Sequence, residues 1–221
     1  MTGFPSQPDD TVPEAPLSKL DTLVRETGKG AIRGLYRIWA KTYDSMLVAM
    51  LGYEAPDFVA RALAPHLPEG DLRVLDVGCG TGLTAEALLT HRKAEVDGID
   101  FSPEMLEQAR DKAFYGELFR ADVTKPLPIP EATYDAAISS GLFTHGHVGA
   151  VAIPHILRVL KPGGLFSFSV YWKVWDRGGF SKMLGKLEKT NAIEILHHEQ
   201  ESHFRMLKNQ HIHTLVVRKK N

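Results

Sequence analysis

The chain has 221 residues, of which 43% are hydrophobic, and this length fits one domain of moderate size with a sizeable core. Its 26 Lys and Arg residues balance 27 Asp and Glu residues, which disfavours general nucleic-acid binding and provides no electrostatic attraction to a membrane surface. The single cysteine, Cys79, excludes an intrachain disulfide. Because we find neither a signal-peptide pattern nor an apolar run near the ~20 residues that span a bilayer, we expect a cytoplasmic protein.

The N-terminal third of the chain predicts helices rather than strands. Apolar residues at spacings of three and four predict a helix over 30–50, which carries Trp39 and Tyr43. A second helix is expected over 56–66, since a proline fits the first turn of a helix. Residues 1–17, which precede both helices, are rich in proline, and this composition predicts disorder. These features divide the chain into a disordered tail (1–17), an N-terminal helical cap (18–70) and a main domain (71–221).

In the main domain, short apolar runs alternate with helix-sized segments. This alternation predicts an α/β fold of the Rossmann-like, doubly wound kind, with helices on both faces of a mostly parallel sheet. The expected strands are 74–77, 96–99, 118–121, 134–139, 165–170, 192–197 and 211–217. The expected helices are 83–91, 103–113, 148–160 and 179–189.

The sharpest motif is the run VLDVGCGTG, which follows the first expected strand and contains Gly78, Gly80 and Gly82. Glycines at this place let the backbone turn tightly and let a ligand approach the main chain. Position 83 is Leu, whereas the dinucleotide fingerprint requires a small residue there, so a nicotinamide-dependent oxidoreductase is disfavoured. Asp76, just before the loop, would repel a pyrophosphate but suits a ligand with an amino group and a sulfonium.

Two further acidic residues end the next two expected strands. Asp100 is placed to accept hydrogen bonds from both hydroxyls of a ribose. Asp122 could accept one from an adenine amino group, with the main-chain N–H of Val123 near the ring, although alone it equally suits a turn. Met105, in the helix after Asp100, could pack on adenine. Since the carboxyl ends of neighbouring parallel strands meet in one crevice, these side chains are expected to surround a single ligand.

Together these residues resemble the motif set of class I S-adenosylmethionine-dependent methyltransferases. The matching stretches are VLDVGCGTG, DGIDFSPEML, RADVTKPLP, YDAAISSGLFTHGHVG and LRVLKPGG. WAKTYD, LGYEAP and GLFTHGHVG resemble a narrower group, the methyltransferase-like proteins of the Williams–Beuren region and their bacterial relatives. The resemblance covers about residues 55–170. It implies a seven-stranded sheet whose last strand runs antiparallel, with S-adenosylmethionine as cofactor and S-adenosylhomocysteine as product.

The resemblance also implies roles for individual residues. Asp76 and the glycine loop would hold the methionine moiety, Asp100 the ribose and Asp122 the adenine. Ser139 and Gly141 would line the methyl side, and the N-terminal helix would cover the cofactor. The implied cofactor-binding residues are Trp39, Tyr43, Asp76, Gly78, Gly80, Gly82, Leu83, Asp100, Phe101, Met105, Ala121, Asp122, Val123, Ser139 and Gly141.

No catalytic residue is assigned, because alignment of the acceptor with the methyl group supplies most of the catalysis in such a displacement. His145 is a candidate base, and Tyr43 is a candidate ring beside the sulfonium. Trp39 and Phe143 are further ring candidates, although aromatic residues at helical spacing more often belong to a core. The C-terminal histidines lack a cysteine or acid at ligand spacing, so we expect a solvated hairpin and no metal site.

The leading hypothesis is an enzyme that methylates an oxygen or nitrogen of a small molecule, with no nucleic-acid or membrane partner. Trp172, Trp175, Phe180 and Phe204 would then form an aromatic acceptor pocket. Two alternatives stay open: a non-catalytic regulatory partner that binds S-adenosylmethionine, and a methyltransferase acting on protein or RNA, because a fold does not define a substrate. The oligomeric state is not predicted.

Overall fold

The computed structural model describes residues 52–146, 148–206 and 209–220. The expected disordered tail and the helix carrying Trp39 and Tyr43 therefore lie outside the described residues, so the proposed cap and domain boundaries stay predictions. None of the described helices is long and apolar enough to cross a bilayer.

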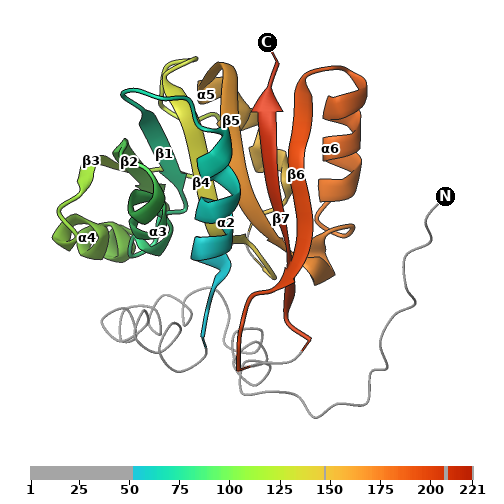
Figure 1. The fold of residues 1–221 in the computed structure, drawn as a ribbon, viewed down its shortest axis with the longest axis horizontal. Helices are drawn as coiled ribbons and strands as arrows, with labels where there is room; N and C mark the ends of the chain where they lie inside the picture. The colour runs from blue at the N-terminus through green and yellow to red at the C-terminus, as the bar shows by residue number, and fades with distance from the viewer. Residues whose placement is uncertain (1–51, 147, 207–208, 221) are drawn as a thin grey trace. The chain divides into compact units, whose positions relative to one another are not determined.

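The centre of the fold is a seven-stranded sheet with the strand order β3-β2-β1-β4-β5-β7-β6 (Figure 1). Strand β7 pairs antiparallel with β5 and with β6, whereas the other neighbouring strands pair in parallel. The predicted fold class and the antiparallel last strand are thereby confirmed. The strands are β1 (Arg73–Val77), β2 (Glu95–Asp100), β3 (Tyr115–Arg120), β4 (Tyr134–Phe143), β5 (Leu160–Tyr171), β6 (Ile193–Ser202) and β7 (His211–Lys219).

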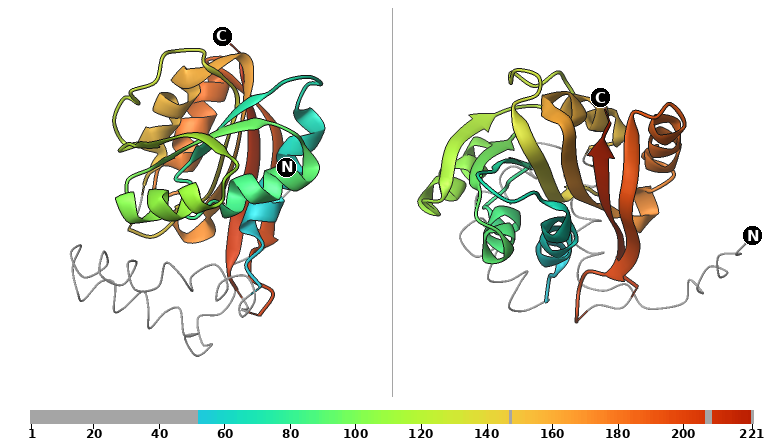
Figure 2. Two further views of the ribbon diagram at one scale, coloured as in Figure 1. Left: turned by 90° about the vertical axis from the view of Figure 1, so that its left-hand side faces the viewer. Right: turned by 45° about the horizontal axis from the view of Figure 1, so that its top comes forward.

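Helices cover both faces of this sheet. The left view of Figure 2 shows α2 (Ala55–Leu63) and α3 (Leu83–His91) on one side and α5 (Ile153–Val159) and α6 (Phe180–Lys189) on the other. Each pair of helices buries its apolar residues against the sheet, which gives two hydrophobic cores on opposite faces. Helix α4 (Pro103–Asp111) packs beside β2 and β3. Single 3-10 turns form η2 (Ala64–His66), η3 (Ala150–Ala152) and η4 (Trp172–Val174).

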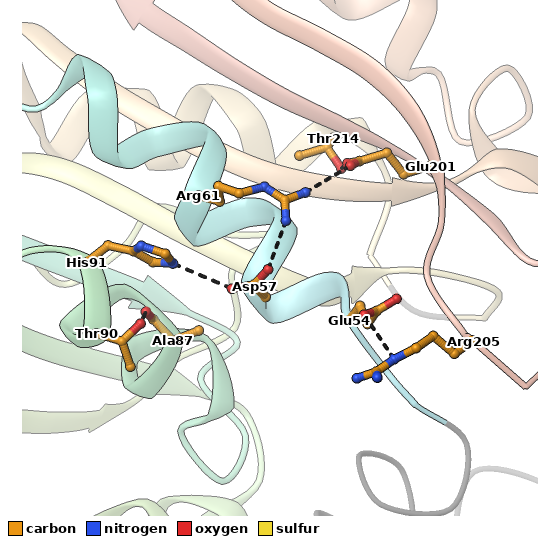
Figure 3. Close-up of polar contacts among 9 residues, drawn as sticks. All are labelled: Glu54, Asp57, Arg61, Ala87, Thr90, His91, Glu201, Arg205 and Thr214. Carbon is orange, nitrogen blue, oxygen red and sulfur yellow. Dashed lines mark hydrogen bonds and ion pairs between the residues drawn. The ribbon is translucent and has the colours of Figure 1, made fainter.

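Helix α2 packs directly on the sheet through its apolar face. Val59 and Leu63 are fully buried, and the buried hydroxyl of Ser167 in β5 donates to the Val59 carbonyl at 2.8 Å. On the outer face, Arg61 pairs with Asp57 at 3.1 Å and with Glu201 at 3.3 Å (Figure 3). Because Arg61 is well exposed, these pairs contribute little, and burial of the apolar face holds the helix in place.

Several boundaries differ from the predictions by a few residues, and two of these differences bear on the site. The expected helix over 148–160 is divided into η3 and α5, and its last residue, Leu160, already pairs with Tyr134 as the first residue of β5. The third strand ends at Arg120, so Asp122 lies in the following loop rather than at the strand end. In both places the pairing between neighbouring strands sets the boundary, which local propensity does not determine.

Candidate functional site

The glycine loop joins the end of β1 to the start of α3. The backbone N–H groups of Gly78 and Cys79 donate to the Ile99 carbonyl in β2 at 2.8 and 2.9 Å, which fixes the loop against the sheet. Gly80 has a φ of +54°, and a Cβ added there would meet no atom within 4 Å. Gly82 caps α3, which begins at Leu83, with a φ of +98° that favours glycine. The loop therefore presents bare backbone at a helix N-terminus, with open space beside Gly80.

Asp100 ties this loop to the turn after β2. Its Oδ2 accepts from the Gly80 N–H at 2.9 Å, and its Oδ1 accepts from the Ser102 N–H at 2.8 Å. The Ser102 hydroxyl in turn caps α4 by accepting from the N–H of Met105, whose side chain is buried. Phe101 is 51% exposed beside this turn. The structure thus brings together the glycine loop and the second acidic motif, as the sequence predicts.

Asp76 lies fully buried near the end of β1. Its Oδ2 accepts from the Tyr115 hydroxyl at 2.7 Å, whereas its buried Oδ1 accepts no hydrogen bond from the described residues. Burial raises the pKa of this carboxyl to about 7, although the Tyr115 hydroxyl opposes the shift. An unsatisfied buried carboxylate beside a glycine loop suits a ligand that carries cationic groups, and this fits S-adenosylmethionine.

The loop after β3 forms the adjoining wall. Ala121 and Val123 are buried, and the Ala121 N–H donates to the Asp100 carbonyl at 3.0 Å. Asp122 accepts from both the N–H and the hydroxyl of Thr124, which lower its pKa. The carboxyl group therefore forms an Asx turn. Its contact with adenine stays a prediction.

At the end of β4, the two serines differ in direction. Ser139 is fully buried, and its hydroxyl donates to the backbone of β1 at 2.7 Å. Ser140 shares a 2.7 Å hydrogen bond with the hydroxyl of Thr84, at the start of α3. Gly141 has a φ of +71°, and a Cβ added there would lie 3.1 Å from the Tyr53 hydroxyl. Beside the glycine loop, the sequence patterns therefore missed three side chains that lie at this end of the sheet, those of Ser140, Thr84 and Tyr53.

Tyr53 is held in place by the tip of the β6–β7 hairpin. It forms an isolated antiparallel bridge with Phe204, and the two rings lie 5.1 Å apart. The Glu54 N–H donates to the His203 carbonyl at 2.9 Å beside this bridge. The Tyr53 hydroxyl hydrogen-bonds with Ser140, and burial raises its pKa to about 12. Only the motif LGYEAP pointed to this segment, because the partner residues are distant in sequence.

Aromatic rings gather around the ends of β4 and β5. The rings of His145 and Tyr171 meet edge to face at 5.3 Å, and Tyr171 meets His203 in the same way at 6.0 Å. Tyr171 donates its hydroxyl to Gln210 at 3.0 Å. Burial lowers the pKa of His203 to about 4, so this imidazole is neutral near pH 7. His145, the candidate base, therefore lies in a cluster of neutral rings.

The structure corrects the expected position of Phe180 and decides between the two alternatives for Phe143. Phe180 and Phe143 are fully buried and pack edge to face at 5.0 Å, so Phe180 does not line an acceptor pocket and Phe143 belongs to the core. Trp175 stacks on His213 at 4.2 Å, and His213 hydrogen-bonds with His198 at 3.0 Å. Trp175, which follows η4, thus covers part of His213, whereas His198 stays exposed. His197 and His211 are half-buried, and His203 is the buried histidine of this hairpin. Among the described residues, no group of three potential ligands could hold a metal ion.

Comparisons with known proteins agree with this geometry. The family model of the methyltransferase domain matches residues 74–164. Over 133 residues the chain is 41% identical to methyltransferase-like protein 27 of Homo sapiens, covering 59% of this chain and 54% of that protein. It is 33% identical over 108 residues to an O-methyltransferase of Pyrenophora dematioidea, covering 46% of this chain and 40% of that protein. The chain thus spans about half the length of these curated relatives, or less.

Solved structures show the same fold. The crystal structure of a SAM-dependent methyltransferase from Aquifex aeolicus matches with a TM-score of 0.58 at 17% sequence identity. The match covers 83% of this chain and 98% of that chain, so it extends well beyond the glycine-loop motif.

Proposed function

We propose that the whole protein transfers a methyl group from S-adenosylmethionine to an oxygen or nitrogen of a small molecule. The proposal starts from the domain at residues 74–164, through which the chain belongs to the class I S-adenosylmethionine-dependent methyltransferases. The observation that carries the proposal is the buried, half-satisfied carboxyl of Asp76 beside a glycine loop with open space at Gly80. A phosphate-bearing cofactor would be repelled by this carboxylate, whereas a cationic one would be stabilised.

In this proposal, each wall of the site takes one part of the cofactor. Asp76 and the loop of Gly78, Gly80 and Gly82, with Leu83, hold the methionine end. Asp100 would exchange its hydrogen bonds to backbone N–H groups for the ribose hydroxyls. The residues proposed for adenine are Phe101, Met105, Ala121, Asp122 and Val123, and those for the methyl side are Ser139 and Gly141, with Trp39 and Tyr43 as cover.

The bound cofactor supplies a methyl group on a sulfonium, and a neutral thioether leaves when that methyl is transferred. The protein's part is to align the acceptor and to exclude water. Tyr53, beside Gly141, and the ring cluster of Tyr171 and His203 provide apolar walls with hydroxyl groups. These side chains are uncharged near neutral pH, which favours a small uncharged acceptor over a phosphate-bearing one. His145 is the candidate base for an acceptor hydroxyl.

The first test is calorimetric titration with S-adenosylmethionine, S-adenosylhomocysteine and NAD, using the wild-type protein and the Asp100→Ala variant. We expect saturable binding of the first two ligands and its loss in the variant. Asp135→Ala is the matched control, because Asp135 pairs with Lys161 at the other end of β4 and should leave binding unchanged. Binding of NAD, or of none of the three, would refute the proposal.

Turnover then separates the enzyme from the non-catalytic regulatory partner. A panel of phenols, alcohols and aromatic amines, all uncharged near neutral pH, would be incubated with labelled S-adenosylmethionine, with RNA and protein as further acceptors. Transfer to a small molecule supports the proposed acceptor class. Transfer only to RNA or protein, or binding without any transfer, would instead favour one of the alternatives.

A further inference from the structure

Tyr115 is a residue that no motif of the domain singles out, yet its hydroxyl reaches the carboxyl beside the glycine loop. It is the first residue of β3, and β2 separates β3 from β1, where Asp76 lies. The hydroxyl donates to Asp76 Oδ2 at 2.7 Å across the intervening strand. The Tyr115 side chain can cross β2 only if no side chain of β2 occupies the space between Tyr115 and Asp76.

Gly98 of β2 provides that clearance. It is the register partner of Asp76, and so it lies on the same part of the sheet. A Cβ at Gly98 would lie 3.1 Å from the Tyr115 ring, 3.1 Å from the Cys79 sulfur and 2.7 Å from Leu118. A larger residue at this position would therefore displace the tyrosine.

A second glycine closes over the same ring from the loop. A Cβ at Gly82, the cap of α3, would lie 3.2 Å from the Tyr115 ring and 3.3 Å from its hydroxyl. The ring thus fits between a strand glycine and a loop glycine, with Phe114 at 4.7 Å beside it. Tyr115 therefore packs directly against the loop that is proposed to hold the cofactor.

We propose that Tyr115 is a positioning residue for the cofactor: its hydroxyl orients Asp76 and holds one carboxyl oxygen, so that the other is directed to the cationic end of S-adenosylmethionine. This inference rests on the proposed function. Among the residues that the structure describes, the ionisable groups that act on Asp76 are Tyr115 from β3, Asp100 from β2 and Cys79 from the loop. Because Tyr115 donates to the carboxylate, it favours the charged form against burial and against Asp100.

The test compares two variants that each remove one tyrosine hydroxyl from one buried aspartate. Tyr115→Phe removes the donor to Asp76, and Tyr134→Phe removes the donor to Asp97, which accepts at 2.9 Å and lies away from the loop. Binding of S-adenosylhomocysteine would be measured by calorimetry between pH 6 and pH 8.5. A hydrogen bond to a charged group corresponds to about a tenfold to hundredfold change, so Tyr115→Phe should weaken binding by that factor at pH 7.

The pH profile separates positioning from a merely structural role. Affinity should rise with pH as Asp76 ionises, and this rise should move to higher pH in Tyr115→Phe but not in Tyr134→Phe. Equal weakening in both variants, or an unchanged profile in Tyr115→Phe, would overturn the proposal.

A cofactor-free measurement separates this failure from failure of the proposed function. Carbon NMR of the Asp76 carboxyl, recorded as a function of pH, should give a higher pKa in Tyr115→Phe than in wild type, with or without a ligand. An unchanged pKa would overturn the proposed interaction between Tyr115 and Asp76. Wild-type protein that binds no S-adenosylhomocysteine would refute the proposed function, and the role of Tyr115 toward the cofactor with it.

Discussion

Replacing Asp76 with asparagine should remove the affinity for the cofactor. It should also increase the free energy of unfolding relative to the wild-type protein, and this increase should become larger as pH rises. The pKa of Asp76 is about 7 in the folded protein because of burial, whereas an unfolded aspartate has a pKa near 3.9. The folded state therefore binds this proton more tightly. The stability that Asp76 contributes is fully present below about pH 4 and is lost as pH rises through 7.

The magnitude follows from the difference of about three pKa units, which corresponds to about 4 kcal/mol of unfolding free energy. Asp76→Asn cannot ionise, so the variant's stability relative to wild type should increase by about that amount between pH 4 and pH 8. A fixed cost of about 1–3 kcal/mol for an unsatisfied amide adds equally at every pH. Other titrating groups are present in both proteins and cancel in the comparison.

The assay is urea unfolding, followed by tryptophan fluorescence at several pH values in this range. Asp135→Asn is the control with the opposite sign. Burial favours a raised pKa for Asp135, but the Arg73 N–H and the Lys161 ammonium outweigh it and hold the pKa of this carboxyl below its usual range. That variant should lose stability at neutral pH and match wild type in acid. A difference between Asp76→Asn and wild type that does not vary with pH would refute the reasoning.

Three further predictions concern the surroundings of the site. In urea unfolding, Gly141→Ala should lower the free energy of unfolding more than Gly146→Ala does. Both glycines have positive φ, but only the first substitution adds a methyl group 3.1 Å from the Tyr53 hydroxyl. Equal losses of unfolding free energy in the two variants would exclude that contact. Burial lowers the pKa of His213 to about 4, so the stability that this imidazole contributes is present above about pH 6.5 and is lost as pH falls towards 4. His213→Phe should therefore lower the pH at which the protein unfolds in acid, and an unchanged midpoint of acid unfolding would contradict this prediction. Leu63→Ala should cost about 2–5 kcal/mol, but Arg61→Ala under about 1, because apolar burial rather than exposed ion pairs holds α2; similar costs in unfolding would reverse that ranking.

Local features of the sequence were sufficient to predict the fold and one half of the site. Runs of apolar residues predicted the strands, and the seven strands formed as expected apart from their boundaries. The glycine loop and Asp100 could be placed in one site because both follow neighbouring parallel strands. Their contact through the Gly80 N–H at 2.9 Å confirms that placement.

The roles of Tyr115 and Tyr53 could not be predicted, because they depend on contacts between elements that are distant in the chain. Tyr115 reaches Asp76 only because the strand order puts β2 between them and because Gly98 aligns with Asp76. Tyr53 lies beside Gly141 only because its segment pairs with the tip of the β6–β7 hairpin.

The sequence by itself determined which segments become strands and helices and where the glycine loop lies, since periodicity, turn residues and helix caps act over a few neighbouring residues. Only the tertiary structure decided which polar side chains meet and which aromatic rings are buried. Phe180 became core because α6 packs on Phe143, and His213 became partly covered because Trp175 stacks on it. Burial and partner choice follow from strand order and register, which bring distant residues together and which local patterns do not encode.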